Sequence, residues 1–144
     1  SSSMPLVSPM VNIDGVPYLD GGVADSVPIR HALKSGNDKI IVVLTRNPGY
    51  RKKPVSKGTA KLYRKAYKSY PKMAACAVHR NRTYNRTMEL VEKLEAEGRI
   101  YVIRPMVPTV SRLERDYDKL MSFYEHGYAL MKKEYANLLR YMEE

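Results

Sequence analysis

The chain has 144 residues, of which 44% are hydrophobic, and it carries a formal net charge of +10. These values suit a folded domain with a core and exclude a wholly disordered chain. No apolar run approaches the roughly 20 residues of a membrane-spanning helix, and no signal peptide is visible. We therefore expect a cytoplasmic protein, peripheral at most to a membrane.

The chain opens Ser-Ser-Ser-Met-Pro without an initiator methionine, which indicates a piece of a longer protein or a processed or tagged chain.

The N-terminal segment predicts a β-hairpin. Residues 11–13 and 16–18 flank Asp14-Gly15, a dipeptide that favours a tight hairpin turn. Pro17 keeps the second strand short or at a sheet edge.

A short helix and a strand follow. Gly21 and Gly22 end the second hairpin strand, and Asp25 or Ser26 is a suitable cap for a helix over residues 29–34 that ends before Gly36. Residues 39–45 form a continuous apolar, β-branched run. Such a run is typical of a strand that is buried on both faces of a parallel sheet.

The middle of the chain predicts two helices and a second strand. The first helix, about 58–70, is stopped by Pro71. The second covers 73–97, with an interruption near Arg80-Asn81 and a C-terminal cap at Gly98. Residues 99–103 predict a second buried strand, ended by Pro105. The order of strands and helices predicts an α/β fold with few strands.

The single cysteine, Cys76, falls in the second of these helices. One thiol can form neither an intramolecular disulfide nor a cysteine-rich zinc site, which favours a reducing compartment. Its alanine and valine neighbours predict a buried, unreactive thiol. His79 and His126 are isolated from other ligand-type residues, so the sequence predicts no metal site.

Residues 114–144 predict a long terminal amphipathic helix. Its apolar side chains recur at alternating steps of four and three and form one seam: Tyr117, Met121, Tyr124, Tyr128, Met131, Tyr135, Leu138 and Met142. We expect this seam to pack on its own domain, because tyrosines make a poor coiled-coil core and Gly127 lies within the helix. The alternatives are a partner-binding helix and a coiled-coil face that forms a homo-oligomer.

The positive charge is concentrated in residues 39–88. This stretch holds fourteen Lys and Arg and no Asp or Glu. Its mixture of cations and tyrosines fits a solvated surface, an anionic membrane surface or a nucleic-acid interface. The candidate lipid-surface contacts are Arg51, Lys52, Lys53, Lys57 and Lys61.

Asp20 is the candidate for chemistry. A carboxylate at the end of a strand in an open α/β sheet points toward the crevice where such folds place their sites. The following Gly21 and Gly22 let the backbone turn sharply. Taken alone, the Asp-Gly-Gly run equally describes an ordinary turn.

The amino-acid sequence around Asp20 resembles the aspartate motif of patatin-like phospholipases. In residues 18–28, Asp-Gly-Gly is followed by a small polar residue and Pro28, and residues 1–5 resemble the small-residue stretch before that motif. The resemblance to bacterial members continues in family order over 39–48, 70–71, 80–85, 98–105 and 111–114. It implies that 1–144 is the C-terminal portion of a single patatin-like domain with a three-layer α/β/α fold.

The resemblance implies a Ser–Asp dyad that hydrolyses lipid or other acyl esters without a cofactor or a metal. Asp20 matches the base that accepts the serine proton, and Gly21 and Gly22 match the glycines of its turn. An acyl-enzyme forms and water releases the fatty acid. A Ser–His–Asp triad through His31 is disfavoured, because no serine here lies in a nucleophile elbow.

The serine of the dyad is absent from these 144 residues. No Gly-x-Ser-x-Gly and no glycine-rich oxyanion loop occur. We therefore expect the nucleophile to come from a missing N-terminal half, and this chain to be inactive alone. The alternative is a non-catalytic basic module on the same scaffold that binds anionic lipid or nucleic acid.

Overall fold

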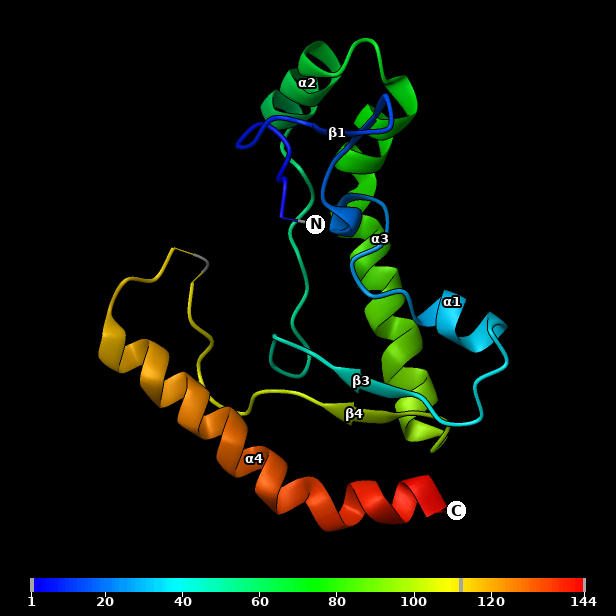
Figure 1. The fold of residues 1–144 in the computed structure, drawn as a ribbon, viewed down its shortest axis with the longest axis vertical. Helices are drawn as coiled ribbons and strands as arrows, with labels where there is room; N and C mark the ends of the chain where they lie inside the picture. Colours follow the sequence, from blue (N-terminus) through cyan, green and yellow to red (C-terminus); the bar gives the residue numbers. More distant parts are fainter. Residues whose placement is uncertain (1, 112, 144) are drawn as a thin grey trace. The chain divides into compact units, whose positions relative to one another are not determined.

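A computed structural model describes residues 2–111 and 113–143 (Figure 1). The chain divides into two compact units, each discontinuous in sequence. Unit 1 is Ser1–His31 with Arg51–Leu90, and unit 2 is Ala32–Tyr50 with Val91–Glu144. Helices and small strand pairs are mixed along the chain, which confirms the α/β class. Within the described ranges, no helix is both long enough and apolar enough to cross a membrane.

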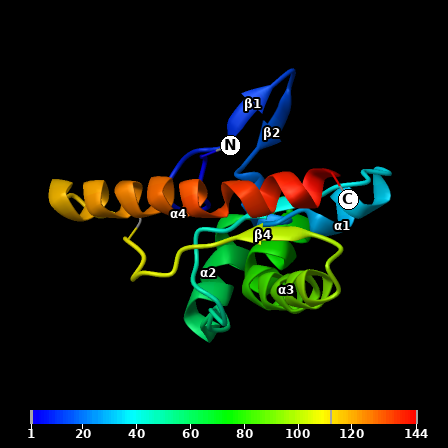
Figure 2. The ribbon, with the colours of Figure 1, turned by 90° about the horizontal axis from the view of Figure 1, so that it is seen from below.

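The predicted hairpin is present in unit 1. Strands β1 (Val11–Ile13) and β2 (Val16–Tyr18) pair antiparallel, with Val11 opposite Tyr18 (Figure 2). Asp14 and Gly15 both have positive φ, 51° and 79°. This left-handed pair is what a two-residue turn of type I′ requires, so the Asp-Gly dipeptide accounts for the hairpin.

The helices of unit 1 largely follow the prediction. The 3-10 helix η1 spans Gly21–Val23, and α2 spans Lys57–Ala66 with Ser56 as its cap. The first residue of α3 (Pro71–Ala96) is the proline that stops the preceding segment. The predicted interruption at Arg80-Asn81 is wrong. The Asn81 amide donates to the carbonyl of Lys53 rather than competing for its own helix backbone.

The core of unit 1 joins α2 to the first half of α3. Its buried residues are Val23, Tyr63, Tyr67, Ala74 and Ala77, and Leu19 is among the partly buried residues packed on them. The Tyr67 hydroxyl also accepts from the backbone N–H of Leu6, at 2.9 Å. Leu6 has φ 68°, and this bond holds its unusual backbone in place.

Cys76 is exposed, so the predicted burial of its thiol is wrong. The small residues on either side, Ala74 and Ala77, occupy the buried positions of α3 instead. Consecutive helical residues are about 100° apart, so a residue between two buried ones points elsewhere. Local apolar composition did not determine which face Cys76 occupies.

Unit 2 contains the predicted parallel strands. Strand β3 (Ile41–Val43) pairs with β4 (Tyr101–Ile103), with Val42 opposite Val102. Val42 is buried, but Val43 is 69% exposed. The expectation that β3 is buried on both faces is therefore wrong for the described structure. In the described residues the sheet of β3 consists of β3 and β4, and Ile41 and Val43 on one face of β3 are exposed. The short helix α1 (Ile29–Lys34) joins the first segments of the two units.

The terminal helix α4 spans Tyr117–Glu143 and starts three residues later than predicted; residue 144 lies outside the described range. It packs on unit 2, beside β4 (Figure 1). The Tyr101 hydroxyl donates to Glu134 Oε2 at 2.7 Å. Tyr141 contacts the Tyr101 ring and bonds to both backbone polar groups of Ile40. Packing on its own unit is thus confirmed.

Only part of the predicted seam packs: Met121, Met131 and Leu138 are half-buried, whereas the tyrosines of the seam face solvent. Tyr117 is 70% exposed, and Tyr124, Tyr128 and Tyr135 are also exposed. The half-buried side chains of the docked side include Phe123, His126, Leu130, Glu134 and Tyr141. At about 100° per residue, the two faces are roughly a third of a turn apart. The homo-oligomer and partner-helix interpretations of the exposed seam stay predictions.

Replacing Glu134 by Gln tests the polar link between β4 and α4. The bond from Tyr101 holds the pKa of Glu134 below its ordinary 4.5. Desolvation, and then the Glu134 carboxylate, raises the pKa of Tyr101 to about 12. The depressed Glu134 value stabilises the fold above pH 4.5, and this contribution is lost as pH falls through the folded value. The stability associated with the raised pKa of Tyr101 is fully present below pH 10 and is lost as pH approaches 12.

We expect Glu134→Gln to lower the urea midpoint at neutral pH, and its difference from wild type to vanish in acid. Glu125→Gln, on an exposed position of α4, is the matched control and should have no such effect. An equal difference at neutral and acid pH would contradict the assignment.

Candidate functional site

Asp20 lies between β2 and η1 and acts as the N-terminal cap of η1. Its Oδ1 accepts from the Gly22 N–H at 2.8 Å, and its carbonyl oxygen accepts from the Val23 N–H at 3.0 Å. Its backbone is extended, with φ −52° and ψ 124°, as a cap requires. The side chain therefore has one defined orientation at the end of the hairpin.

Two serines surround this turn. The Asp20 N–H donates to the carbonyl of Ser3 at 2.9 Å, and the Ser26 hydroxyl donates to the carbonyl of Gly22 at 2.9 Å. Ser3 and Ser26 belong to residues 1–5 and 18–28, the two stretches whose resemblance to a patatin-like motif stays a prediction. Ser1, the first residue of the upstream stretch, lies outside the described residues, as does Arg112 of the 111–114 stretch.

The second carboxylate oxygen of Asp20 is the chemically available one. In the described part of the chain, the hydrogen bonds to this carboxylate involve Oδ1 alone. The side chain is half-buried. An oriented carboxylate with one oxygen held and the other open has the geometry of a base that accepts a proton from a neighbouring hydroxyl.

The two glycines after Asp20 are not equivalent. A Cβ on Gly22 would lie 3.3 Å from Asp20 Oδ1, whereas a Cβ on Gly21 would meet nothing within 4 Å. The close approach of the Gly22 N–H to the carboxylate leaves little room for a side chain there. Both were predicted as supporting residues, and in this geometry only Gly22 is constrained by packing.

The five predicted surface cations occupy two different settings. Lys57 and Lys61 are exposed on α2, whereas Arg51, Lys52 and Lys53 lie in the extended segment before it. The Lys52 ammonium lies 3.9 Å from the centroid of the Tyr84 ring. The Asn85 side chain bonds to both the N–H and the carbonyl of Lys52. Lys52 is thus held against its own unit.

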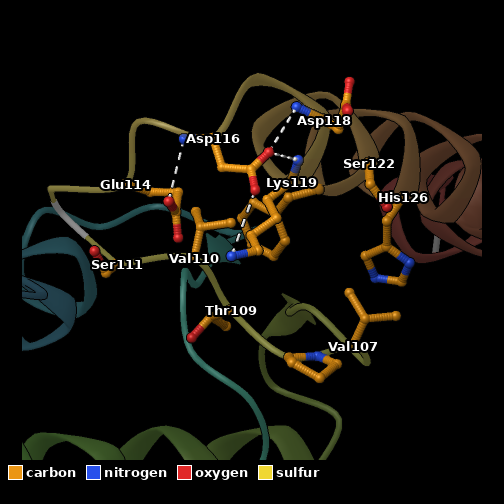
Figure 3. Close-up of a pocket in the computed structure, with 12 residues that line it drawn as sticks. Val107, Thr109, Val110, Ser111, Glu114, Asp116, Asp118, Lys119, Ser122 and His126 are labelled. Atoms are coloured by element: carbon orange, nitrogen blue, oxygen red, sulfur yellow. Dashed lines mark hydrogen bonds and ion pairs between the residues drawn. The ribbon is translucent and has the colours of Figure 1, made fainter.

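A cavity of about 680 Å³ lies in unit 2 at the start of α4 (Figure 3). Two of its three carboxylates, Glu114 and Asp116, accept hydrogen bonds from backbone N–H groups near the start of the helix. Asp116 Oδ1 accepts from the N–H groups of Asp118 and Lys119. The backbone bond from Lys119, aided by its ammonium at 3.5 Å, holds the pKa of Asp116 below its ordinary value. This is the usual work of a helix cap.

A smaller, apolar cavity of about 270 Å³ lies beside Gly127 of α4. Its two ionisable side chains already have partners. Arg104 pairs with Glu95, and His126 Nε2 accepts from the Met106 N–H. The described residues also contain no group of three or more His, Cys, Asp or Glu that could hold a metal ion. Neither cavity competes with Asp20 as a site for chemistry.

Alanine substitution at Gly21 and Gly22 tests whether the contact between Asp20 and Gly22 constrains the turn. Gly22→Ala should lower the free energy of unfolding by about 1 kcal/mol, the usual cost of a lost cap, because its Cβ displaces the Asp20 carboxylate. Gly21→Ala is the matched control. It should raise stability by about 0.4–1 kcal/mol, because it restricts the unfolded chain without a clash. Urea unfolding measures both, and equal effects would contradict the described turn.

Comparison with known proteins gives one family. A family model described as a domain of unknown function (DUF6363) matches residues 70–143, which cover α3, β4 and α4. No curated protein and no solved structure matches the chain. The matched residues make up just over half of the sequence. The chain therefore belongs to the DUF6363 family, whose function is not known.

Proposed function

We propose that this chain supplies the aspartate base of a Ser–Asp dyad in a patatin-like lipid acyl hydrolase, as the C-terminal portion of that domain. The observation that carries the proposal is the Asp20 carboxylate, which is oriented through Oδ1 by the Gly22 N–H, while no hydrogen bond from a described residue reaches Oδ2. The resemblance of residues 18–28 to the patatin-like aspartate motif supports it. The nucleophilic serine belongs to a segment outside these 144 residues.

In this reaction the carboxylate moves two protons. Asp20 accepts the proton of the serine hydroxyl as the serine oxygen attacks the ester carbonyl carbon. The proton then passes to the departing alcohol, which leaves an acyl-serine. A water molecule gives its proton to the same carboxylate and attacks the acyl carbon, and the serine leaves with that proton as the fatty acid is released. No metal or cofactor is needed.

Two features of the turn favour this role over a purely structural cap. A cap needs one oxygen, and Asn or Ser would serve nearly as well as Asp. The flanking stretches are tied to the turn from both sides, because the Ser3 carbonyl accepts from the Asp20 N–H and the Ser26 hydroxyl donates to the Gly22 carbonyl. Orientation of this kind is what a base must have before its substrate arrives.

The chain alone should be inactive, because a base without a nucleophile has nothing to activate. With a chromogenic short-chain ester, residues 1–144 should show no turnover above buffer, and Asp20→Asn should change nothing. Turnover by the chain alone that Asp20→Asn abolishes would contradict the proposal.

The dyad itself is tested in the full product of the reading frame. If upstream sequence supplies Gly-x-Ser-x-Gly, Asp20→Asn should lower kcat by about 10²–10⁴, the usual contribution of a general base. Asp25→Asn is the control, because the Asp25 side chain is exposed and accepts from the N–H of the nearby Val27. Full activity with Asn at position 20, or no elbow serine in the gene, would favour the non-catalytic alternative.

A further inference from the structure

We propose that α2 is the surface through which unit 1 docks on an anionic lipid bilayer. Five cations of α2 and its C-terminal end define this surface, here called the α2 cationic face: Lys57, Lys61, Arg64, Lys65 and Lys68. At about 100° per residue, the four within the helix fall inside roughly 100° of arc. All five residues are exposed.

The core sets the direction of this face. The other side of α2 carries Ala60 and Tyr63, which are buried, and the capping residue Tyr67 is buried as well. These aromatic side chains pack on Ala74 and Ala77 of α3. The cations therefore point away from the core of unit 1 and are presented together by a helix that cannot rotate without exposing two tyrosines.

The charge on this face is not balanced within unit 1. Unit 1 contains thirteen Lys and Arg against four Asp and Glu, so nearly all of the net +10 belongs to it. None of the ion pairs seen among the described residues involves the five cations of the α2 cationic face. A compact, unneutralised cationic face is complementary to an anionic surface.

The aromatic residues favour lipid over nucleic acid. A single-stranded nucleic acid interface uses exposed aromatic rings on which bases stack. Tyr63 and Tyr67, which are interspersed with these cations, are only 9% and 8% exposed, whereas Tyr70, beyond the end of the helix, is 44% exposed. Leu62, an apolar side chain of α2 itself, is 50% exposed. A leucine next to lysines adds nothing to phosphate-backbone contacts, but it can insert at the boundary between headgroups and acyl chains.

Vesicle sedimentation tests the proposal with the 144-residue chain. The probes are sucrose-loaded vesicles of phosphatidylcholine, with and without phosphatidylglycerol, at low and raised salt. A basic residue near an anionic surface strengthens binding by roughly fivefold. Lys61→Glu combined with Arg64→Glu should therefore weaken binding to the anionic vesicles by at least about 25-fold.

The control changes the same charge elsewhere. Lys133→Glu combined with Arg140→Glu alters two exposed cations of α4 and should leave vesicle binding within about twofold of wild type. Circular dichroism and thermal melting establish that both double variants fold. Leu62→Ser separates insertion from attraction: it should bind as wild type at low salt and lose binding at lower salt concentrations than wild type does.

Three results would overturn the proposal. One is equal binding to neutral and anionic vesicles, and a second is equal loss of binding in the α4 double variant. The third is tighter binding to a single-stranded oligonucleotide than to anionic vesicles at the same salt, lost in the α2 variant, which would assign the face to nucleic acid. None of these depends on ester hydrolysis, so the docking surface stands or falls independently of the proposed dyad.

Discussion

The cluster formed by Tyr63 of α2, the capping residue Tyr67 and two alanines of α3 organises unit 1. Tyr63 and Tyr67 bring large rings, and Ala74 and Ala77 leave the space in which those rings can be buried. Leu19 and Val23, which bracket the Asp20 turn, belong to the same cluster. The Tyr67 hydroxyl also reaches the backbone of Leu6. The same cluster thus supports the segment before the hairpin, the Asp20 turn and the α2 cationic face.

This arrangement explains why the proposed functional residues are so close in sequence to buried residues. Asp20 directly follows Leu19, which packs against the core, and each cation of the α2 cationic face is within three residues of a buried one. A small unit cannot separate its working surface from its core by long connections. Buried and solvent-facing residues instead alternate along the same helix or turn. The packed core therefore holds the neighbouring exposed side chains in place.

Features governed by neighbouring residues could be predicted from the sequence. The Asp14-Gly15 hairpin, the proline boundary at Pro71 and the parallel strand pair all follow from local propensity or run composition. The Asp20 turn also belongs here, because a carboxylate bonding to the N–H two residues on is a local motif. The motif's likeness to patatin-like enzymes, rather than any spacing rule, suggested its chemistry.

Features set by distant partners could not be predicted. Which face of α4 packs depends on Tyr101 and Ile40, residues that are far away in the sequence. The Tyr-rich seam had the stronger periodicity, yet the side that reaches β4 carries Glu134 and Tyr141. Lys52 was grouped with free surface cations because nothing near it in sequence reveals the ring of Tyr84. Periodicity identifies the apolar face of a helix, but tertiary contacts decide which face packs.

The exposed position of Cys76 has a chemical consequence for handling and for redox behaviour. It is the sole thiol of the chain and it lies on the solvent side of α3. Under oxidising conditions no intramolecular disulfide can compete, so any disulfide must join two chains or attach a small thiol. The same uniqueness makes α3 a position where a single maleimide-linked dye or spin label reports on unit 1 without any cysteine being introduced.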